Sequence, residues 1–181
     1  MKIEERVKNM MGRVFTLPSG KKARANVVAV LTNRKGISRF IPGLNCVTND
    51  GDEHYAQRGA AETPDMTVVG MRLGTDNTAP TKSDTDVTSF LAGSGKNIDG
   101  TYPMTDDSDG DNTGSGVDIV SWRVSYTTSE ANGSGIYEGA LVDNISSPTV
   151  ALCHWVFGAS FNKTSSDTLK VFVNHEMAGQ L

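Results

Sequence analysis

The sequence has only two cysteines, no long apolar run and no excess of basic residues. A helix that crosses a bilayer needs roughly 20 mostly apolar residues, and no segment reaches that length, so we expect no membrane association. The N-terminal residues lack the apolar core of a secretory signal, so we expect the protein to fold and assemble in a reducing cytoplasm. The 17 lysines and arginines are outnumbered by 21 aspartates and glutamates, giving a net charge of −4. A mildly acidic chain argues against a broad nucleic-acid-binding surface.

Spacings that would mark an enzyme or a zinc site are also missing. The chain has no GxSxG, HExxH or P-loop spacing, so the sequence predicts no catalytic residues and no enzymatic activity. His154 lies in the apolar run 152–156, where a hydrogen-bonded core histidine is the simplest interpretation. Cys46 and Cys153 fit neither a CxxC motif nor a zinc pattern. Two buried thiols and one long-range disulfide both stay open.

What the sequence does contain is a series of short β patterns separated by turns. The clearest is 119–127, where Val120, Trp122, Val124 and Tyr126 alternate with polar residues. This alternation places the four large side chains on one face of a strand. Further strands are predicted at 27–31, 66–73, 136–142, 150–157 and 169–173. A short helix is predicted at 50–61, beginning at Asp50 or Asp52.

These patterns predict an all-β fold: a single antiparallel β-sandwich, jelly-roll or Ig-like, with an extended N-terminal arm that carries one short helix. We place the arm at residues 1–42, as a short helix followed by a basic hairpin or extended segment, and the sandwich at residues 43–181. Within the sandwich, residues 91–116 are rich in Gly, Ser, Asp and Asn. Because they have little to bury, they are predicted to form an exposed acidic loop.

The predicted arm combines an apolar helix face with a cluster of basic residues. Ile3, Val7, Met10 and Met11 recur at helical spacing, but so short a helix is not stable alone in water and needs a surface to lie on. The basic residues that follow are Arg13, Lys21, Lys22, Arg24, Arg34, Lys35 and Arg39. Such an arm either docks on an acidic partner surface through these residues or completes its own domain, with the charges protecting a sheet edge.

The acidic loop contains the strongest candidate for a metal site. Asp107, Asp109, Asp111 and Asp118 fall at positions one, three, five and twelve of a calcium-binding loop, and Ca²⁺ requires hard oxygen ligands at such alternate positions. Position six is Asn112 rather than glycine, and no helical pattern flanks the loop. A solvated acidic loop is therefore the main interpretation and a Ca²⁺ site is the alternative; no other cofactor is predicted.

Several segments, read in order, resemble a family of small structural proteins of tailed bacteriophages. They are the Asn-rich stretch 43–51 (GLNCVTNDG), the segment 71–85 (MRLGTDNTAPTKSDT), the turn 129–133 (SEANG), the strand 136–142 (IYEGALV) and the entry to the last strand, 163–169 (KTSSDTL). Each segment alone consists largely of residues that are common in turns. Their order and spacing give the resemblance, which covers about residues 43–177 and leaves residues 1–42 and 91–116 unmatched.

The resemblance implies a virion protein rather than an activity. The leading hypothesis is a capsid decoration or cement protein, located in the virion, that binds the major capsid protein or other virion proteins. A homo-oligomer is expected as well, with trimers favoured at lattice symmetry axes. A neck, collar or tail accessory protein is the first alternative. A host-surface glycan-binding module is the second; it would need exposed aromatic residues, whereas Trp122 and Tyr126 share an apolar strand face.

Overall fold

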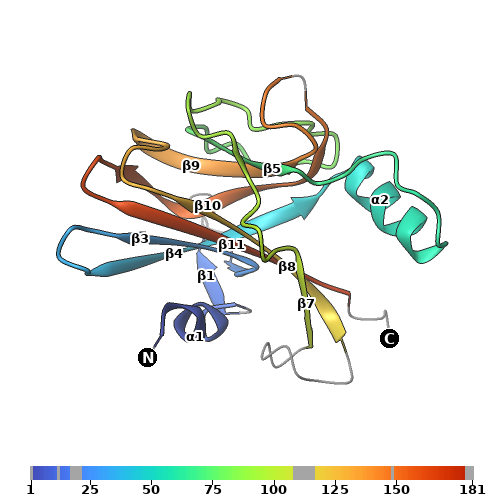
Figure 1. Cartoon of the computed structure of the whole chain (residues 1–181), viewed down its shortest axis with the longest axis horizontal. Helices are drawn as coiled ribbons and strands as arrows, with labels where there is room; N and C mark the ends of the chain where they lie inside the picture. The colour runs from blue at the N-terminus through green and yellow to red at the C-terminus, as the bar shows by residue number, and fades with distance from the viewer. Residues whose placement is uncertain (1, 12, 17–21, 108–116, 148, 178–181) are drawn as a thin grey trace.

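The structure of the protein is a computed structural model, which describes residues 2–11, 13–16, 22–107, 117–147 and 149–177 (Figure 1). These residues form helices α1 (Ile3–Lys8) and α2 (Asn49–Gly59). The strands are β1 (Val14–Thr16), β2 (Lys22–Arg24), β3 (Val27–Thr32), β4 (Ser38–Val47), β5 (Gly70–Gly74), β6 (Lys96–Asn97), β7 (Met104–Asp107), β8 (Val117–Tyr126), β9 (Gly133–Val142), β10 (Ala151–Lys163) and β11 (Thr168–Glu176).

Strands β3 to β11 form one antiparallel sheet in the order β6-β5-β9-β10-β4-β3-β11-β8-β7, whereas β1 and β2 make a separate two-stranded sheet. The fold is therefore mostly β and antiparallel, as the sequence predicts. The strands do not divide into two packed sheets, because each is hydrogen-bonded to the next in one continuous, curled sheet. In Figure 1 the curl brings β5 and β9 across from β8 and β11.

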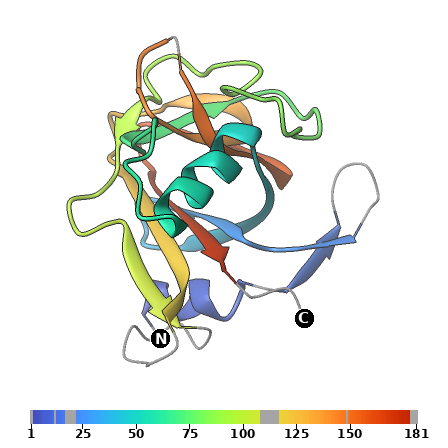
Figure 2. The ribbon, with the colours of Figure 1, turned by 90° about the vertical axis from the view of Figure 1, so that its right-hand side faces the viewer.

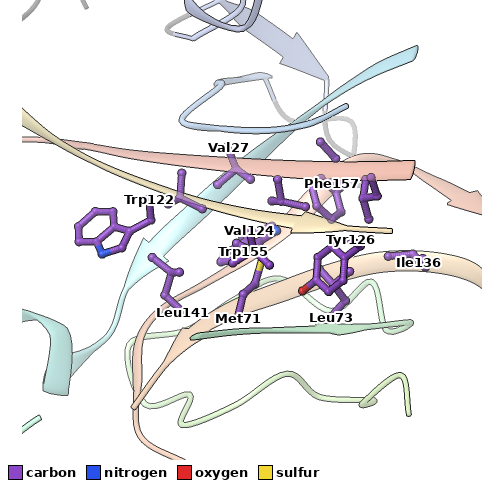
Figure 3. Packing of buried hydrophobic residues seen from close by; sticks show 14 of the residues in the cluster. Val27, Met71, Leu73, Trp122, Val124, Tyr126, Ile136, Leu141, Trp155 and Phe157 are labelled. Carbon is purple, nitrogen blue, oxygen red and sulfur yellow. The ribbon is translucent and has the colours of Figure 1, made fainter. Parts of the chain in front are cut away.

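The concave side of the curled sheet encloses the main hydrophobic core. On β8, Trp122, Val124 and Tyr126 are at most 3% exposed, because alternate residues of a strand point to the same face; the pattern predicted for this strand is confirmed. These side chains meet Met71 and Leu73 of β5 across the interior (Figure 3). The pairing of β10 with β9 contains register shifts. Such irregularities increase strand twist and help the sheet to curl around its own side chains.

Asp99, between β6 and β7, joins the two ends of the curled sheet. Its carboxylate accepts hydrogen bonds from Arg123 Nε (2.6 Å), from the backbone N–H of Ser125 (3.0 Å) and from the Ser125 hydroxyl (2.7 Å). The Asp99 N–H in turn donates to the carbonyl of Arg123 at 2.9 Å. The segment that follows β5 is thereby fastened to β8, at the far end of the strand order.

Residues 91–107 differ from the exposed loop that we predicted for 91–116. β6 pairs with β5 and β7 pairs with β8, and Ser94 is completely buried. The Ser94 hydroxyl donates to the carbonyl of Leu73 at 3.0 Å, so a polar residue takes an interior position because its hydrogen bonds are satisfied there. The remainder of the predicted loop, residues 108–116, lies outside the described residues.

The predicted N-terminal arm divides into three parts in the structure. α1 packs on the outer face of the sheet, and Val7 is buried there against Val28, Val30 and Phe172. The β1–β2 hairpin stands apart from the sheet, as Figure 2 shows. Residues 27–42, in contrast, form β3 and the first half of β4, in the middle of the sheet between β10 and β11. The boundary predicted between residues 42 and 43 was wrong, because it falls inside β4.

Helix α2 follows β4 directly and is close to its predicted position. Thr48 caps it: the Thr48 hydroxyl oxygen accepts a hydrogen bond from the Gly51 N–H at 3.0 Å. The helix begins at Asn49, so the predicted start at Asp50 or Asp52 was one or three residues late. Gly51 lets the helix lie against β10, because a Cβ atom at this position would be 2.0 Å from the carbonyl oxygen of Leu152. Within the described residues, no helix is long and apolar enough to cross a membrane.

Candidate functional site

Two carboxylates hold the buried side chain of His154 between β10 and the loop that follows β5. Nδ1–H donates to Asp84 Oδ2 at 2.6 Å, and Nε2–H donates to Glu138 Oε2 at 2.8 Å. His154 is 1% exposed and Glu138 is fully buried. We refer to Asp84, Glu138 and His154 as the histidine bridge.

Strand pairing and a folded-back loop together assemble the histidine bridge. His154 pairs with Ala140, two residues from Glu138, so both side chains lie on the same face of the sheet. The Glu138 carboxylate also accepts hydrogen bonds from the loop N–H groups of Asp76 (3.1 Å), Thr88 (2.8 Å) and Ser89 (2.8 Å). The loop therefore covers the bridge and supplies most of the partners of its buried carboxylate.

The charges of the histidine bridge stabilise one another. Burial alone would lower the pKa of His154, but the hydrogen bonds and negative charges of Glu138 and Asp84 outweigh burial and raise this pKa above its usual value. Burial alone would raise the pKa of Glu138, but hydrogen bonds from His154 and from the loop amides lower it. The pKa of Asp84 is lowered in the same way, by His154 and Thr81. The bridge is thus an imidazolium between two carboxylates.

This geometry suits the histidine bridge to holding the loop rather than to transferring protons. A general base needs a free nitrogen lone pair, and both ring nitrogens of His154 donate to carboxylates. A second ion pair fastens the same loop: Arg72 Nε on β5 lies 2.9 Å from Asp86 Oδ1, and Arg72 Nη1 donates to the carbonyl of Ile145 at 3.0 Å. The two ion pairs fix the loop onto the outer face of the sheet.

A second buried histidine, His175, belongs to a neutral cluster instead. Its Nδ1–H donates to the hydroxyl oxygen of Tyr55 at 2.5 Å, and the side-chain amide of Asn45 donates to its Nε2. Its ring packs edge-on against Trp122, with 4.9 Å between the ring centroids. Burial lowers the pKa of His175 to about 3. The cluster joins α2, β4 and β11, and it contains no charged group that would attract a ligand.

The two cysteines are free thiols on neighbouring strands. The residue that pairs with Cys46 across β4 and β10 is His154, and Cys153 pairs with Val47. Since successive residues of a strand face opposite sides, Cys153 points into the core while Cys46 points to the outer face. The structure therefore favours the two-thiol interpretation. Burial raises the pKa of Cys153 to about 12, so this thiol stays protonated and unreactive.

The predicted calcium ligands are only partly within the structure. Asp109 and Asp111 lie outside the described residues. Asp107 ends β7 and Asp118 lies near the start of β8, on two paired strands. Among the described residues, no group of three or more His, Cys, Asp or Glu side chains is placed to hold a metal ion. The Ca²⁺ site stays a prediction.

The residues predicted to form a docking arm occupy different parts of the molecule. The apolar helix residues lie on the protein's own sheet: Val7 is buried, and Ile3, Met10 and Met11 pack around it. Of the basic residues, Arg13 precedes the β1–β2 hairpin, Lys22 and Arg24 lie in β2, and Lys21 lies outside the described residues. Arg34 and Lys35 are exposed at the turn between β3 and β4, and Arg39 is exposed near the start of β4. Only the hairpin resembles the extended arm that we predicted.

The aromatic residues considered for glycan binding are mostly in the core. Trp155 is fully buried, and Trp122 and Tyr126 are 3% and 2% exposed. The Tyr126 hydroxyl donates to the carbonyl of Ser94 at 2.9 Å, so its polar end is satisfied inside the protein. Tyr137 is half-buried. These residues do not form an exposed stacking platform.

The histidine bridge was missed as a unit, although its histidine was recognised as a core residue. Glu138 gives a weak signal, because a charged residue interrupts the apolar run from Ile136 to Val142. The sequence does not show that His154 is the cation paired with Glu138. This pairing depends on the register of β9 and β10 and on the path of the loop after β5. Sequence spacing carries no information about either.

The protein was compared with family models, with curated proteins and with solved structures, and no match was found in any of the three comparisons.

Proposed function

We propose that the protein is a structural component of tailed-bacteriophage particles, a decoration or cement protein that binds the outside of the capsid. The resemblance in residues 43–177 supports a virion protein. Those residues make up most of the curled sheet, which in this role serves as a compact β-sandwich-like body with β5 and β9 lying over β8 and β11. The observation that carries the docking part of the proposal is the β1–β2 hairpin, which is separate from the sheet.

The hairpin is suited to contact with an acidic surface. Arg13, Lys22 and Arg24 lie in or next to it. Val14, which follows Arg13 and pairs with Arg24 in the strand register, is 61% exposed. Charges at the edge of an interface steer and orient a partner. The partner we propose is the major capsid protein or a neighbouring virion protein. Because a shell repeats the same site many times, each contact needs little affinity of its own.

Charge reversal in the hairpin tests the proposed function. We expect the variant Arg13→Glu/Lys22→Glu/Arg24→Glu to fold normally and to be lost from purified particles, because three attractive contacts become repulsive. A variant with three reversals elsewhere, Lys2→Glu/Lys8→Glu/Arg58→Glu, matches the change in net charge and is expected to be incorporated like the wild type. The readout is the number of copies per particle by quantitative mass spectrometry.

Copy number also separates the two virion roles. Many copies distributed over the shell indicate a decoration protein, and a few copies confined to one vertex indicate a neck, collar or tail protein. Absence of the wild-type protein from particles, or equal incorporation of the hairpin variant and the wild type, would contradict the proposal.

A further inference from the structure

Two ends of the molecule, the β3–β4 turn and a pocket beside α2, carry opposite charge. We propose that the protein binds a second copy of itself head to tail, with the β3–β4 turn of one copy seated in an acidic pocket beside α2 of the next. This contact goes beyond the proposed function and does not depend on it, since it requires only this chain.

The first end is a rigid turn with an exposed isoleucine at its tip. The Asn33 side-chain oxygen accepts hydrogen bonds from the N–H groups of Lys35 and Ile37, both at 3.0 Å. The Asn33 N–H donates to the carbonyl of Ile37, also at 3.0 Å. Gly36 has φ +75°, a left-handed conformation that glycine adopts without strain. The turn is therefore held in a single shape before any partner arrives.

The side chains at this tip are suited to an interface. Ile37 is 64% exposed, and three exposed cations, Arg34, Lys35 and Arg39, lie within three residues of it in the chain. None of the three lies within 4.0 Å of a carboxylate in the part of the chain that the structure describes. An exposed apolar residue with charged residues close to it is typical of the centre and rim of a protein–protein contact.

The second end is a pocket of about 150 Å³ beside α2. Its rim carries four carboxylates, and its wall includes the buried Met66 and the half-buried Val150. Its lining residues are Asp50, Glu53, His54, Gln57, Asp65, Met66, Asp143 and Val150. Among the described residues, no basic side chain lies within 4.0 Å of these four carboxylates. The pocket thus presents uncompensated negative charge around an apolar wall.

His54 adds a hydrogen-bond acceptor to the wall of the pocket. Its side chain is 9% exposed, and Nδ1–H donates to the carbonyl of Met66 at 3.0 Å. Its Nε2 has no hydrogen-bond partner among the described residues, although the ring lines the pocket. In the proposed contact, an arginine or lysine of the second copy donates a hydrogen bond to this nitrogen.

The positions of the two ends exclude a contact within one molecule. β4 begins directly after the turn and ends directly before α2, and ten residues of extended strand span roughly 33 Å. Figure 1 shows the β3–β4 turn and α2 at opposite ends of the molecule. A copy therefore cannot seat its own turn in its own pocket, and a second copy can. A contact between two different surfaces of identical chains produces a ring or an open filament.

Charge exchange between the two ends tests this proposal in purified protein. We expect the average mass of the wild type to rise with concentration at low ionic strength and to fall at about 0.5 M salt, where exposed charges are screened. Arg34→Glu/Lys35→Glu and Glu53→Lys/Asp65→Lys should each weaken association by at least about tenfold, because like charges then face each other. A mixture of these two variants should associate again. Sedimentation velocity measures all of these states.

The matched control is Lys2→Glu/Lys8→Glu, which changes the net charge as much as the turn variant but lies at the two ends of α1. It is expected to associate like the wild type, and circular dichroism checks that every variant is folded. A wild type that stays monomeric over the whole concentration range would overturn the proposal. Equal weakening by the control, or failure of the mixture to associate, would also overturn it. None of these outcomes depends on incorporation into a phage particle.

Discussion

Replacement of His154 by phenylalanine tests the role of the histidine bridge. Phenylalanine has a comparable flat ring but no charge and no N–H, so His154→Phe keeps much of the packing and removes both hydrogen bonds. The carboxylate of Glu138, which is fully buried, then loses its positive partner. Asp84 loses its partner as well, although it is closer to solvent.

The expected destabilisation is large compared with the stability of a domain. Breaking a buried ion pair by removing one partner costs about 3–5 kcal/mol, because the charge that stays behind is neither solvated nor paired. Domains of this size unfold with a free energy of roughly 5–15 kcal/mol. The loss corresponds to a decrease in Tm of about 6–20 °C, at roughly 2–4 °C for each kcal/mol.

The pH dependence identifies the bridge as the cause. The pKa of His154 is raised above 6.5 in the folded protein, so its contribution to stability is complete below pH 6.5 and is lost as the pH rises through the raised pKa. The pKa values of Glu138 and Asp84 are lowered, so their contributions are present above about pH 4.5 and are lost as the pH falls through the lowered values. The bridge is therefore most stabilising between about pH 4.5 and 6.5.

Urea denaturation of the wild type and of His154→Phe across this range measures the difference in unfolding free energy. We expect the difference to be largest near pH 6 and to shrink at alkaline pH, where the wild type has itself lost the imidazolium charge. A difference below about 1 kcal/mol at pH 6, or one that stays constant from pH 6 to alkaline pH, would refute the reasoning.

Two further predictions concern His175 and the glycines of α2. Because the pKa of His175 falls from 6.5 to about 3 on folding, the unfolded state binds a proton that the folded state does not, and the wild type should lose about 1.4 kcal/mol of stability per pH unit between pH 6 and pH 5. Urea denaturation of His175→Phe should give a flatter profile in this interval, and an unchanged slope would contradict the assignment. Gly51→Ala should lower Tm, with a cost of about 1–3 kcal/mol, because the new Cβ would meet the Leu152 carbonyl oxygen at 2.0 Å. The control in the same helix is Gly59→Ala, which has open space around the new Cβ and should increase the unfolding free energy by about 0.5–1 kcal/mol. Equal effects of the two substitutions on Tm would exclude the contact with β10 as the cause.

Strands with a clear alternation could be predicted from the sequence, and strands built from polar or turn-forming residues could not. The alternation of Trp122, Val124 and Tyr126 with polar residues predicts β8, because a period of two is a local property of the chain. β4 contains Pro42, Gly43 and Asn45, which are uncommon within strands, and the boundary predicted where the resemblance begins, between residues 42 and 43, divides it. Its neighbours β3 and β10 make it a central strand, and its pairing with β10 connects residues more than 100 positions apart along the chain.

The sequence by itself determined the local properties of this protein: an antiparallel β fold, a short helix near residue 50, two cysteines without a metal motif, and basic residues gathered in the first quarter. These follow from side-chain type and short-range spacing, which act within a few residues. Only the tertiary structure decided how distant segments meet. It divided the basic residues between a separate hairpin and a rigid turn, placed α1 on its own sheet, and brought Asp84, Glu138 and His154 together. The physical reason is that strand register and loop path depend on packing and hydrogen bonding between distant segments. The order of residues within one segment does not determine these interactions.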